Sequence, residues 1–386
     1  MTIAWRAVGI LLVTVGTASL VPRTGHAHGS ITTTVLFDRE IVGLLERRCV
    51  SCHNEGGLSF PLSTYEQTWV KRLSMRTEVL RRHMPPWAAV PGYGEFANDN
   101  GLTVREAQFL VSWVEGLGPR NAGSTFLNVP VGKAPAPVRA SARAGAWQLG
   151  QPDVARTLKS ATVPASPGPV VLRATIVLGL TEPARVSAIE FLPGDRRRLR
   201  AAWFRIESTG QWLGSWTPWY GFAKLPQGVA FQLPAGTRLS AELHFGPGPE
   251  PVTDIGTVGV FRARGESAPA ADLVVTARST PGRSRVRRGS VRLASDATIW
   301  ALAPEIPSGT QSMELSVRQP DGSTEVLLLV ERPSDDWPTP YVLKTPVRLT
   351  RGTELRFALE TDAPSTAPAR LVISRYASLR PGAFRP

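Results

Sequence analysis

A chain of 386 residues has room for two or three domains, and its hydrophobic content of 42% is ordinary for a globular protein. The 35 glycines and 34 prolines argue against a helical bundle and favour many short strands and turns. The net charge of +13 arises mainly in residues 122–386, which carry 32 Lys/Arg against 21 Asp/Glu. These cations are mostly arginines dispersed through strand-like segments. We therefore expect no nucleic-acid partner and at most a peripheral contact with an anionic membrane surface.

The N-terminus has the pattern of an export signal. Arg6 provides a short positive region, Ala7 to Val21 is apolar, and Gly25-His26-Ala27 offers small residues at a cleavage position. We expect residues 1–27 to be a signal peptide and the protein to be periplasmic or otherwise exported. An uncleaved N-terminal anchor is the alternative.

Both cysteines of the chain lie in the pentapeptide Cys49-Val50-Ser51-Cys52-His53. C-x-x-C-H is the attachment signature of a c-type haem. At this spacing each thiol can bond one vinyl-derived carbon of the porphyrin, and the histidine that follows can then ligate the iron. The pattern predicts one haem c, held covalently by Cys49 and Cys52, with His53 as an axial ligand. An oxidising compartment, which the leader implies, agrees with this interpretation.

A C-x-x-C pair has two other common uses. A thioredoxin-like redox site requires a βαβ setting, and the sequence shows none around these cysteines. A structural zinc site requires four ligands, and neither a second cysteine pair nor a histidine pair follows nearby. Both alternatives are therefore weaker than haem attachment.

Three helices are predicted around the motif. Residues 37–48 have an apolar face and Asp38 as a candidate cap, and this helix leads into Cys49. Ser63-Thr64-Tyr65-Glu66 matches a capping box for a second helix that runs to about Arg82. Thr103-Val104-Arg105-Glu106 matches another, which opens a final helix closed by Gly118-Pro119. The expected buried face of this final helix consists of Ala107, Leu110, Val111, Val114 and Leu117.

The second helix is followed by His83-Met84-Pro85-Pro86-Trp87. A methionine thioether is a neutral, soft iron ligand that raises the reduction potential, so Met84 is the candidate for the sixth ligand. The two prolines lack backbone donors and restrict φ, which favours a rigid irregular loop. His83 is the alternative distal ligand. The order of helix, C-x-x-C-H, Met-Pro loop and terminal helix resembles a class I cytochrome c, and the resemblance covers residues 30–121. It implies an all-α domain.

The rest of the chain has a different pattern. Residues 122–145 are rich in Pro, Ala and Gly without periodicity, which predicts a linker. Short strand-like segments separated by turns follow, and they predict two all-β sandwich domains over residues 146–264 and 265–386. In the second of these, Pro320-Asp321-Gly322 is a hairpin turn signal. The six segments predicted as strands in the first sandwich are 170–178, 186–191, 201–206, 228–233, 238–245 and 257–261.

These segments carry a second resemblance, to the tandem jelly rolls of the ascorbate-dependent type II copper monooxygenases. In the first half it rests on Glu190 to Gly194, Gly214-Ser215-Trp216 and Leu233 to Thr237. In the second half the similar residues are Ala303-Pro304, Gln319 to Gly322, Trp337, Tyr341 and Arg351-Gly352-Thr353. The resemblance implies a jelly-roll pair that normally binds copper through several histidines.

The histidines of that family are missing here. The expected His-His pair falls near Arg200-Ala201, and the later His-x-His keeps His244 but has Gly246 at its partner position. A Pro-His-x-His pattern is replaced by Pro304-Glu305-Ile306-Pro307. Since residues 122–386 contain a single histidine, we expect copper not to be a cofactor.

The sequence therefore predicts an exported mono-haem c-type cytochrome that transfers electrons to a redox partner protein of unknown identity. Its β region would be a docking or binding module without catalytic residues, so an enzymatic activity is not expected. Two alternatives stay open. One is a copper-dependent monooxygenase that receives electrons from the fused haem, and the other is a haem-based sensor or peroxidase.

Overall fold

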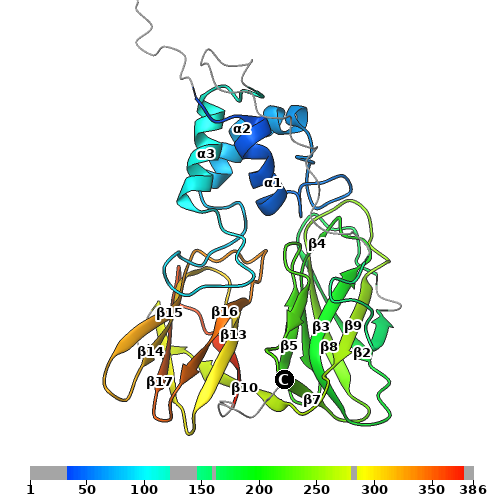
Figure 1. Ribbon diagram of the computed structural model, residues 1–386, viewed down its shortest axis with the longest axis vertical. Helices are drawn as coiled ribbons and strands as arrows, with labels where there is room; N and C mark the ends of the chain where they lie inside the picture. Colours follow the sequence, from blue (N-terminus) through cyan, green and yellow to red (C-terminus); the bar gives the residue numbers. More distant parts are fainter. Residues whose placement is uncertain (1–32, 122–145, 159–161, 280–284, 378–386) are drawn as a thin grey trace, which may run out of the picture.

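The computed structural model describes residues 33–121, 146–158, 162–279 and 285–377 (Figure 1). The predicted signal peptide and linker lie outside the described residues. The protein is mostly β, with three β-sheets in a sandwich-like arrangement and a small N-terminal region of three helices. The helical region lies across one end of the β region (Figure 1).

The first predicted helix is present as a π-turn followed by an α-helix, η1 (Phe37–Ile41) and α1 (Val42–Arg48). Asp38 does not cap it, because the helix begins at Phe37 and Leu36 occupies the N-cap position. Instead the Leu36 amide donates to the Glu40 carboxylate (2.9 Å), which satisfies a free donor of the first turn. The helix buries Ile41, Leu44 and Leu45 and ends at Arg48, with Cys49 as its C-cap.

The other two helices are α2 (Tyr65–Leu80) and α3 (Val104–Glu115). The capping box of α2 is one residue later than predicted, with Thr64 as N-cap and Gln67 as its partner. That of α3, formed by Thr103 and Glu106, is confirmed. The buried face of α3 consists of Leu110, Trp113 and Val114. Leu117 was expected on this face but lies past the helix end with a positive φ and is exposed.

The β region contains eighteen described strands in three sheets. A nine-stranded sheet has the order β1-β9-β3-β7-β10-β18-β13-β16, with β6 paired to β3. A four-stranded sheet, β2-β8-β4-β5, and a five-stranded sheet, β11-β12-β17-β14-β15, pack against its two halves. The strand bounds are β1 Val154–Thr157, β2 Val170–Val177, β3 Ala184–Pro193, β4 Leu199–Ile206, β5 Trp212–Trp216, β6 Phe222–Lys224, β7 Val229–Leu233, β8 Arg238–Phe245, β9 Gly256–Arg262, β10 Ala268–Thr276, β11 Arg278–Ser279, β12 Val286–Arg292, β13 Ala297–Glu305, β14 Thr310–Arg318, β15 Thr324–Glu331, β16 Tyr341–Leu349, β17 Glu354–Thr361 and β18 Arg370–Tyr376.

The two halves of the β region are joined through one continuous sheet. β7 and β10 pair in parallel, with Val229 opposite Ala268 and Ala230 opposite Pro269. The pairing places the strands of both halves in the nine-stranded sheet. Two apolar cores result, one for each half, and Trp300 of β13 contributes to the core of the first half by stacking on Trp212 of β5. We call strands β1–β9 the first β region and strands β10–β18 the second β region.

All six strands predicted in the first β region are present within two residues of their expected ends. The predicted hairpin turn at Pro320-Asp321-Gly322 joins β14 to β15, and Gly322 has a positive φ there. Three strands of the first β region were not predicted, namely β1, β5 and β6. None of the described helices is both long and apolar enough to span a bilayer.

Candidate functional site

The C-x-x-C-H pentapeptide forms a tight turn at the end of α1. The amides of Cys52 and His53 both donate to the Cys49 carbonyl, at 3.1 and 2.9 Å. This turn places the two cysteines and the histidine within one short stretch of backbone. The loop after it closes on itself, because the Leu62 amide donates to the His53 carbonyl (3.0 Å). We call residues 49–62 the attachment loop.

Two glycines allow the attachment loop to turn back. Gly56 has a φ of +71°, a conformation that residues with a side chain rarely adopt. At Gly57, a Cβ atom would lie 2.5 Å from the Cys52 carbonyl oxygen, so the close approach of the backbone requires glycine. The attachment loop therefore turns at Gly56-Gly57.

The two thiols are unpaired and partly buried. Burial raises the pKa of Cys49 to about 12 and that of Cys52 to about 11. A thioredoxin-like redox cysteine requires the opposite, a pKa low enough to yield a thiolate near neutral pH. The environment of this pair therefore does not favour thiol–disulfide exchange.

One ring nitrogen of His53 forms a hydrogen bond within the attachment loop. Its Nδ1 lies 3.0 Å from the Phe60 carbonyl oxygen, and the Phe60 ring packs against it with centroids 4.8 Å apart. Because a carbonyl only accepts, Nδ1 carries the proton and Nε2 keeps its lone pair. Burial lowers the pKa of His53, which favours this neutral form. A histidine that donates one N–H to a backbone carbonyl while its other nitrogen is free is the usual arrangement of a metal ligand.

Met84 and His83 lie directly after α2. The amides of both residues donate to the Glu78 carbonyl, at 3.4 and 2.9 Å. The His83 imidazole is largely exposed and pairs with the Glu78 carboxylate (Nδ1–Oε2 3.1 Å), whereas Met84 is half-buried. Among the described residues, no hydrogen bond or ring contact joins this stretch to His53.

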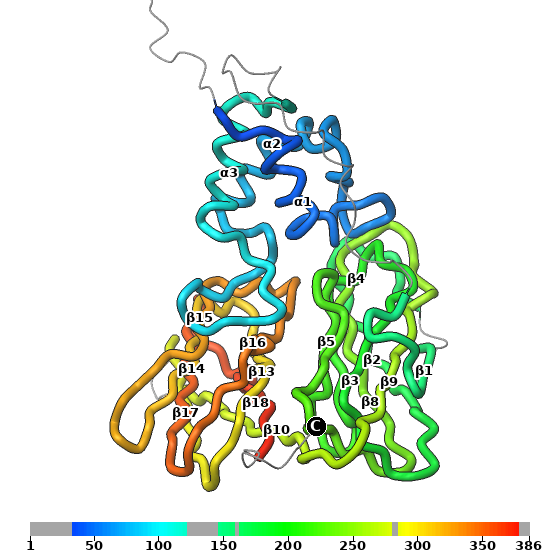
Figure 2. The backbone as a smooth tube through the Cα atoms, in the orientation of Figure 1, coloured from blue at the N-terminus to red at the C-terminus, as the bar shows by residue number. Residues whose placement is uncertain are grey.

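Residues 87–98, which we call the docked segment, leave the helical region and pack on the second β region (Figure 2). At one end of this segment, Val90 donates to Leu329, and Ala88 accepts from Glu331. At its other end, Ala97 donates to Val342. These backbone bonds reach β15 and β16, the edge strands of two different sheets. The segment therefore covers two sheet edges that would otherwise expose unpaired backbone groups.

The first β region approaches the helical region at the other side of the junction. Arg196, in the turn between β3 and β4, lies within electrostatic range of the Cys52 sulfur. Its guanidinium also stands over the Trp216 ring, 5.9 Å from the centroid. In Figure 2 the attachment loop lies directly above β4 and this turn. The attachment loop thus faces a cationic side chain of the first β region.

The arginines of the β region were expected to be dispersed, but three of them form a run at positions 196–198. The three side chains have different roles. Arg197 is exposed and pairs with Asp195 and Glu250. Arg198 is buried and donates to three backbone carbonyls. The run follows the turn residues Pro193-Gly194-Asp195. This position, at a turn beside a strand, could have identified the run from the sequence as a cluster of cations at one end of the sheet.

At the positions where copper-binding histidines were expected, the side chains form salt bridges instead. His244 of β8 pairs with Glu242 (Nε2–Oε1 3.1 Å). At Gly246, a Cβ atom would lie 2.7 Å from Nε of Arg200, so the Arg200 side chain occupies this space. Arg200 crosses to the second β region, where it pairs with Asp336 (2.5 Å). In the second β region Glu305 pairs with Arg205 and Arg370. No group of three or more His, Cys, Asp and Glu in the described part of the chain is placed to hold a metal ion.

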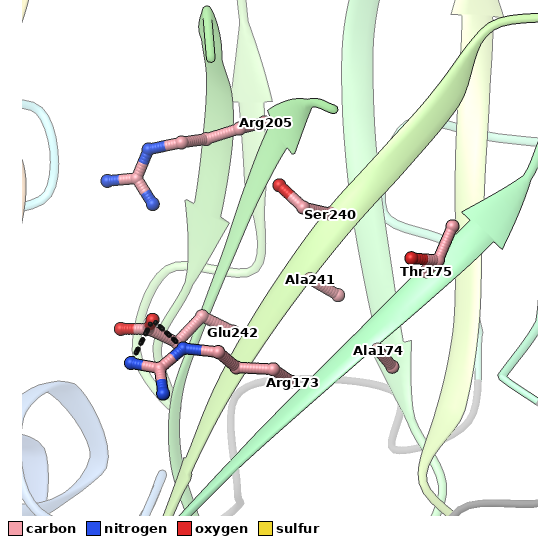
Figure 3. A pocket seen from close by; sticks show the side chains of 7 residues that line it. All are labelled: Arg173, Ala174, Thr175, Arg205, Ser240, Ala241 and Glu242. Carbon is pink, nitrogen blue, oxygen red and sulfur yellow. Dashed lines mark hydrogen bonds and ion pairs between the residues drawn. The ribbon is translucent and has the colours of Figure 1, made fainter. Parts of the chain in front are cut away.

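A shallow hollow of about 260 Å³ lies on the outer face of the four-stranded sheet (Figure 3). Its charged side chains already have partners, since Arg173 pairs with Glu242 and Arg205 with Glu305. The hydrogen bond from His244 and the charge of Arg173 hold the pKa of Glu242 down, to about 2. The hollow is therefore lined by a neutralised charge network. Its residues are Arg173, Ala174, Thr175, Arg205, Ser240, Ala241 and Glu242.

Comparison with known proteins gives only distant structural similarities. No protein-family model matches the chain, and neither does any curated protein sequence. Similar solved structures include a glycoside hydrolase 29 family member from an unknown rumen bacterium (14% identity, 52% of this chain and 38% of that one, TM-score 0.19). The major capsid protein P2 of bacteriophage PM2 (10%, 58% and 99%, TM-score 0.24) and the CBM22 tandem domain of Paenibacillus barcinonensis Xyn10C (11%, 60% and 99%, TM-score 0.18) are also similar. At these TM-scores the similarities carry no functional inference.

Proposed function

We propose that this protein is an exported mono-haem c-type cytochrome that transfers single electrons, and that Cys49, Cys52 and His53 hold the haem. The observation that carries the proposal is the state of His53, whose Nδ1 donates to the Phe60 carbonyl while Nε2 stays available. Two unpaired thiols lie one turn away on the same loop. These residues fit a haem bound through two thioethers and one imidazole.

When bound, the haem would supply one-electron exchange between its ferric and ferrous states. The chain would contribute its axial ligands and an apolar surrounding. In the helical region several large apolar side chains are exposed, among them Phe60, Trp69, Val70, Leu73 and Leu80. These side chains are the candidates for apolar contact with the haem or with the redox partner. The β region would act as a docking module for the redox partner, and the altered copper positions support a non-catalytic role.

Met84 would be the sixth ligand, and a matched pair of variants tests this assignment. Met84→Leu removes the sulfur with little change in volume, and Met75→Leu makes the same change in the buried face of α2. Met84→Leu should abolish the sulfur-to-iron charge-transfer band of the oxidised protein. It should also lower the reduction potential by on the order of 0.1 V, within the ~0.8 V that axial ligands span. Met75→Leu should leave both unchanged.

The measurement requires protein matured in the periplasm, with haem quantified per chain by the pyridine haemochrome spectrum. One haem per chain is expected, and it should stay attached after denaturation because the thioether bonds are covalent. A protein without attached haem would contradict the whole proposal. An unchanged band and potential in Met84→Leu would contradict only the assignment of Met84.

A further inference from the structure

The docked segment begins three residues after the candidate ligand Met84, and it ends at a buried asparagine. Asn98 is 2% exposed, and its side chain makes two hydrogen bonds to the backbone that leads into β16. Its Nδ2 donates to the Pro340 carbonyl (2.7 Å), and its Oδ1 accepts from the Val342 amide (3.0 Å). A single side chain therefore joins positions that are more than 240 residues apart in the sequence.

The backbone of Asn98 makes a third connection. Its carbonyl accepts a hydrogen bond from the indole of Trp219 (3.1 Å), which belongs to the first β region. Trp219 in turn packs on Trp337 of the second β region, with ring centroids 5.9 Å apart. Asn98 is thus the point at which a segment of the helical region contacts both β regions at once.

The start of the docked segment is anchored by aromatic packing. Trp87 and Phe96 both contact the ring of Tyr341, each with centroids 5.3 Å apart, and they contact one another at 5.9 Å. Only two residues, Pro85 and Pro86, separate Met84 from the anchoring ring of Trp87. Because proline restricts φ, this connection has little freedom to absorb a displacement of Trp87.

We infer that Asn98 is a positioning residue for the distal haem ligand, and that the second β region holds Met84 in place through the docked segment. The inference rests on the proposed function, and it gives the second β region a role at the haem itself. If the segment is released, Met84 should leave the iron more easily. Removing the Asn98 amide would leave the Val342 amide and the Pro340 carbonyl buried without these partners, which loosens the segment.

The test compares Asn98→Ala with Tyr93→Ala in the full-length, haem-loaded protein. Tyr93 lies in the same segment, but its ring is 39% exposed at the turn near Gly92 and Gly94. The readouts are the strength of the sulfur-to-iron band during heating and the rate at which carbon monoxide binds to the reduced protein. In Asn98→Ala the band should disappear at a lower temperature. Carbon monoxide should bind about tenfold faster, the change that ~1.4 kcal/mol in the stability of the ligated state produces.

Haem content per chain should be the same in both variants, and Tyr93→Ala should match the wild type in both readouts. If Asn98→Ala does not fold, Trp219→Phe replaces it, because phenylalanine keeps an aromatic ring but removes the indole donor to the Asn98 carbonyl. It should shift both readouts in the same direction by a smaller amount. A band and a binding rate equal to those of the wild type in folded Asn98→Ala or Trp219→Phe would overturn the inference. A wild type that has haem but lacks the band would instead refute Met84 as the ligand, and this inference with it.

Discussion

The attachment loop and the docked segment, which lie on either side of α2 in the sequence, are held in place by different kinds of contact. The attachment loop is closed by hydrogen bonds between residues that are near in sequence, such as Leu62 to His53, which are nine positions apart. The docked segment depends on Leu329 and Val342, more than 230 positions away. A haem site built from both would have a locally determined proximal side and a distal side that forms only when the β region has folded.

This difference affects the order in which the two segments reach their positions during folding. Contacts between residues near in sequence cost little loop-closure entropy and can form early, whereas contacts between residues far apart in sequence form late. We therefore expect the two thiols and His53 to reach their arrangement without help from the β region. The position of Met84, by contrast, should respond to changes in a domain that contributes no candidate ligand. Four predictions examine this contrast.

The largest effect should come from the attachment loop itself. Replacing both thiols, as Cys49→Ser with Cys52→Ser, removes the two atoms that can form thioether bonds. The expected result is complete loss of covalently attached haem, measured by haem staining after denaturing electrophoresis. The β region should fold as in the wild type, since neither cysteine contributes to its two cores. Covalent haem in the double variant would contradict the assigned attachment residues.

An intermediate effect should come from the anchor of the docked segment. Tyr341→Ala removes a ring that is 2% exposed and packs on Trp87 and Phe96, so it should lower the free energy of unfolding by about 3–5 kcal/mol. Urea unfolding followed by tryptophan fluorescence measures this change. The sulfur-to-iron band should disappear at a lower urea concentration, while covalent haem per chain stays constant.

Phe60→Ala provides the matching change on the proximal side. The Phe60 ring packs on His53 but is 36% exposed, so its removal should cost only about 1 kcal/mol. If Phe60→Ala destabilised the β region as much as Tyr341→Ala, the separation between a local proximal side and a non-local distal side would be wrong.

The smallest effect should come from Arg196, the cation of the first β region that faces the attachment loop. A nearby positive charge stabilises the more reduced, less positive state of a metal centre, so Arg196→Gln should lower the reduction potential. At about 1 kcal/mol for a partly screened charge, the decrease would be on the order of tens of millivolts. Arg197→Gln is the control, because Arg197 is exposed and already paired with Asp195 and Glu250. Equal shifts in both variants would show that Arg196 has no specific proximity to the haem.

The structure explains the residues found at the positions where copper-binding histidines were expected. The sequence alone identified that Arg200, Gly246 and Glu305 stand where histidines were expected. It could not show that the Arg200 side chain takes the space beside Gly246 and pairs with Asp336 of the other β region. A salt bridge between the two β regions is present at this position.

The sequence by itself determined the local features of this protein. The three helices, the capping box of α3, the turn at Gly56-Gly57 and the hairpin at Pro320-Asp321-Gly322 follow from residue preferences within a few positions. The C-x-x-C-H pentapeptide belongs to the same class, since its spacing alone brings the two cysteines and the histidine into one turn. Errors at this level were small, such as the cap assigned to Asp38.

Only the tertiary structure decided what surrounds that pentapeptide. The parallel pairing of β7 with β10, the docking of residues 87–98 on two sheet edges and the approach of Arg196 to Cys52 all join distant parts of the chain. No local pattern specifies such partners, because many strand edges and apolar faces would satisfy the same hydrogen bonds and bury similar area. The choice among them is made by the packing of the whole β region, which a local sequence pattern does not describe.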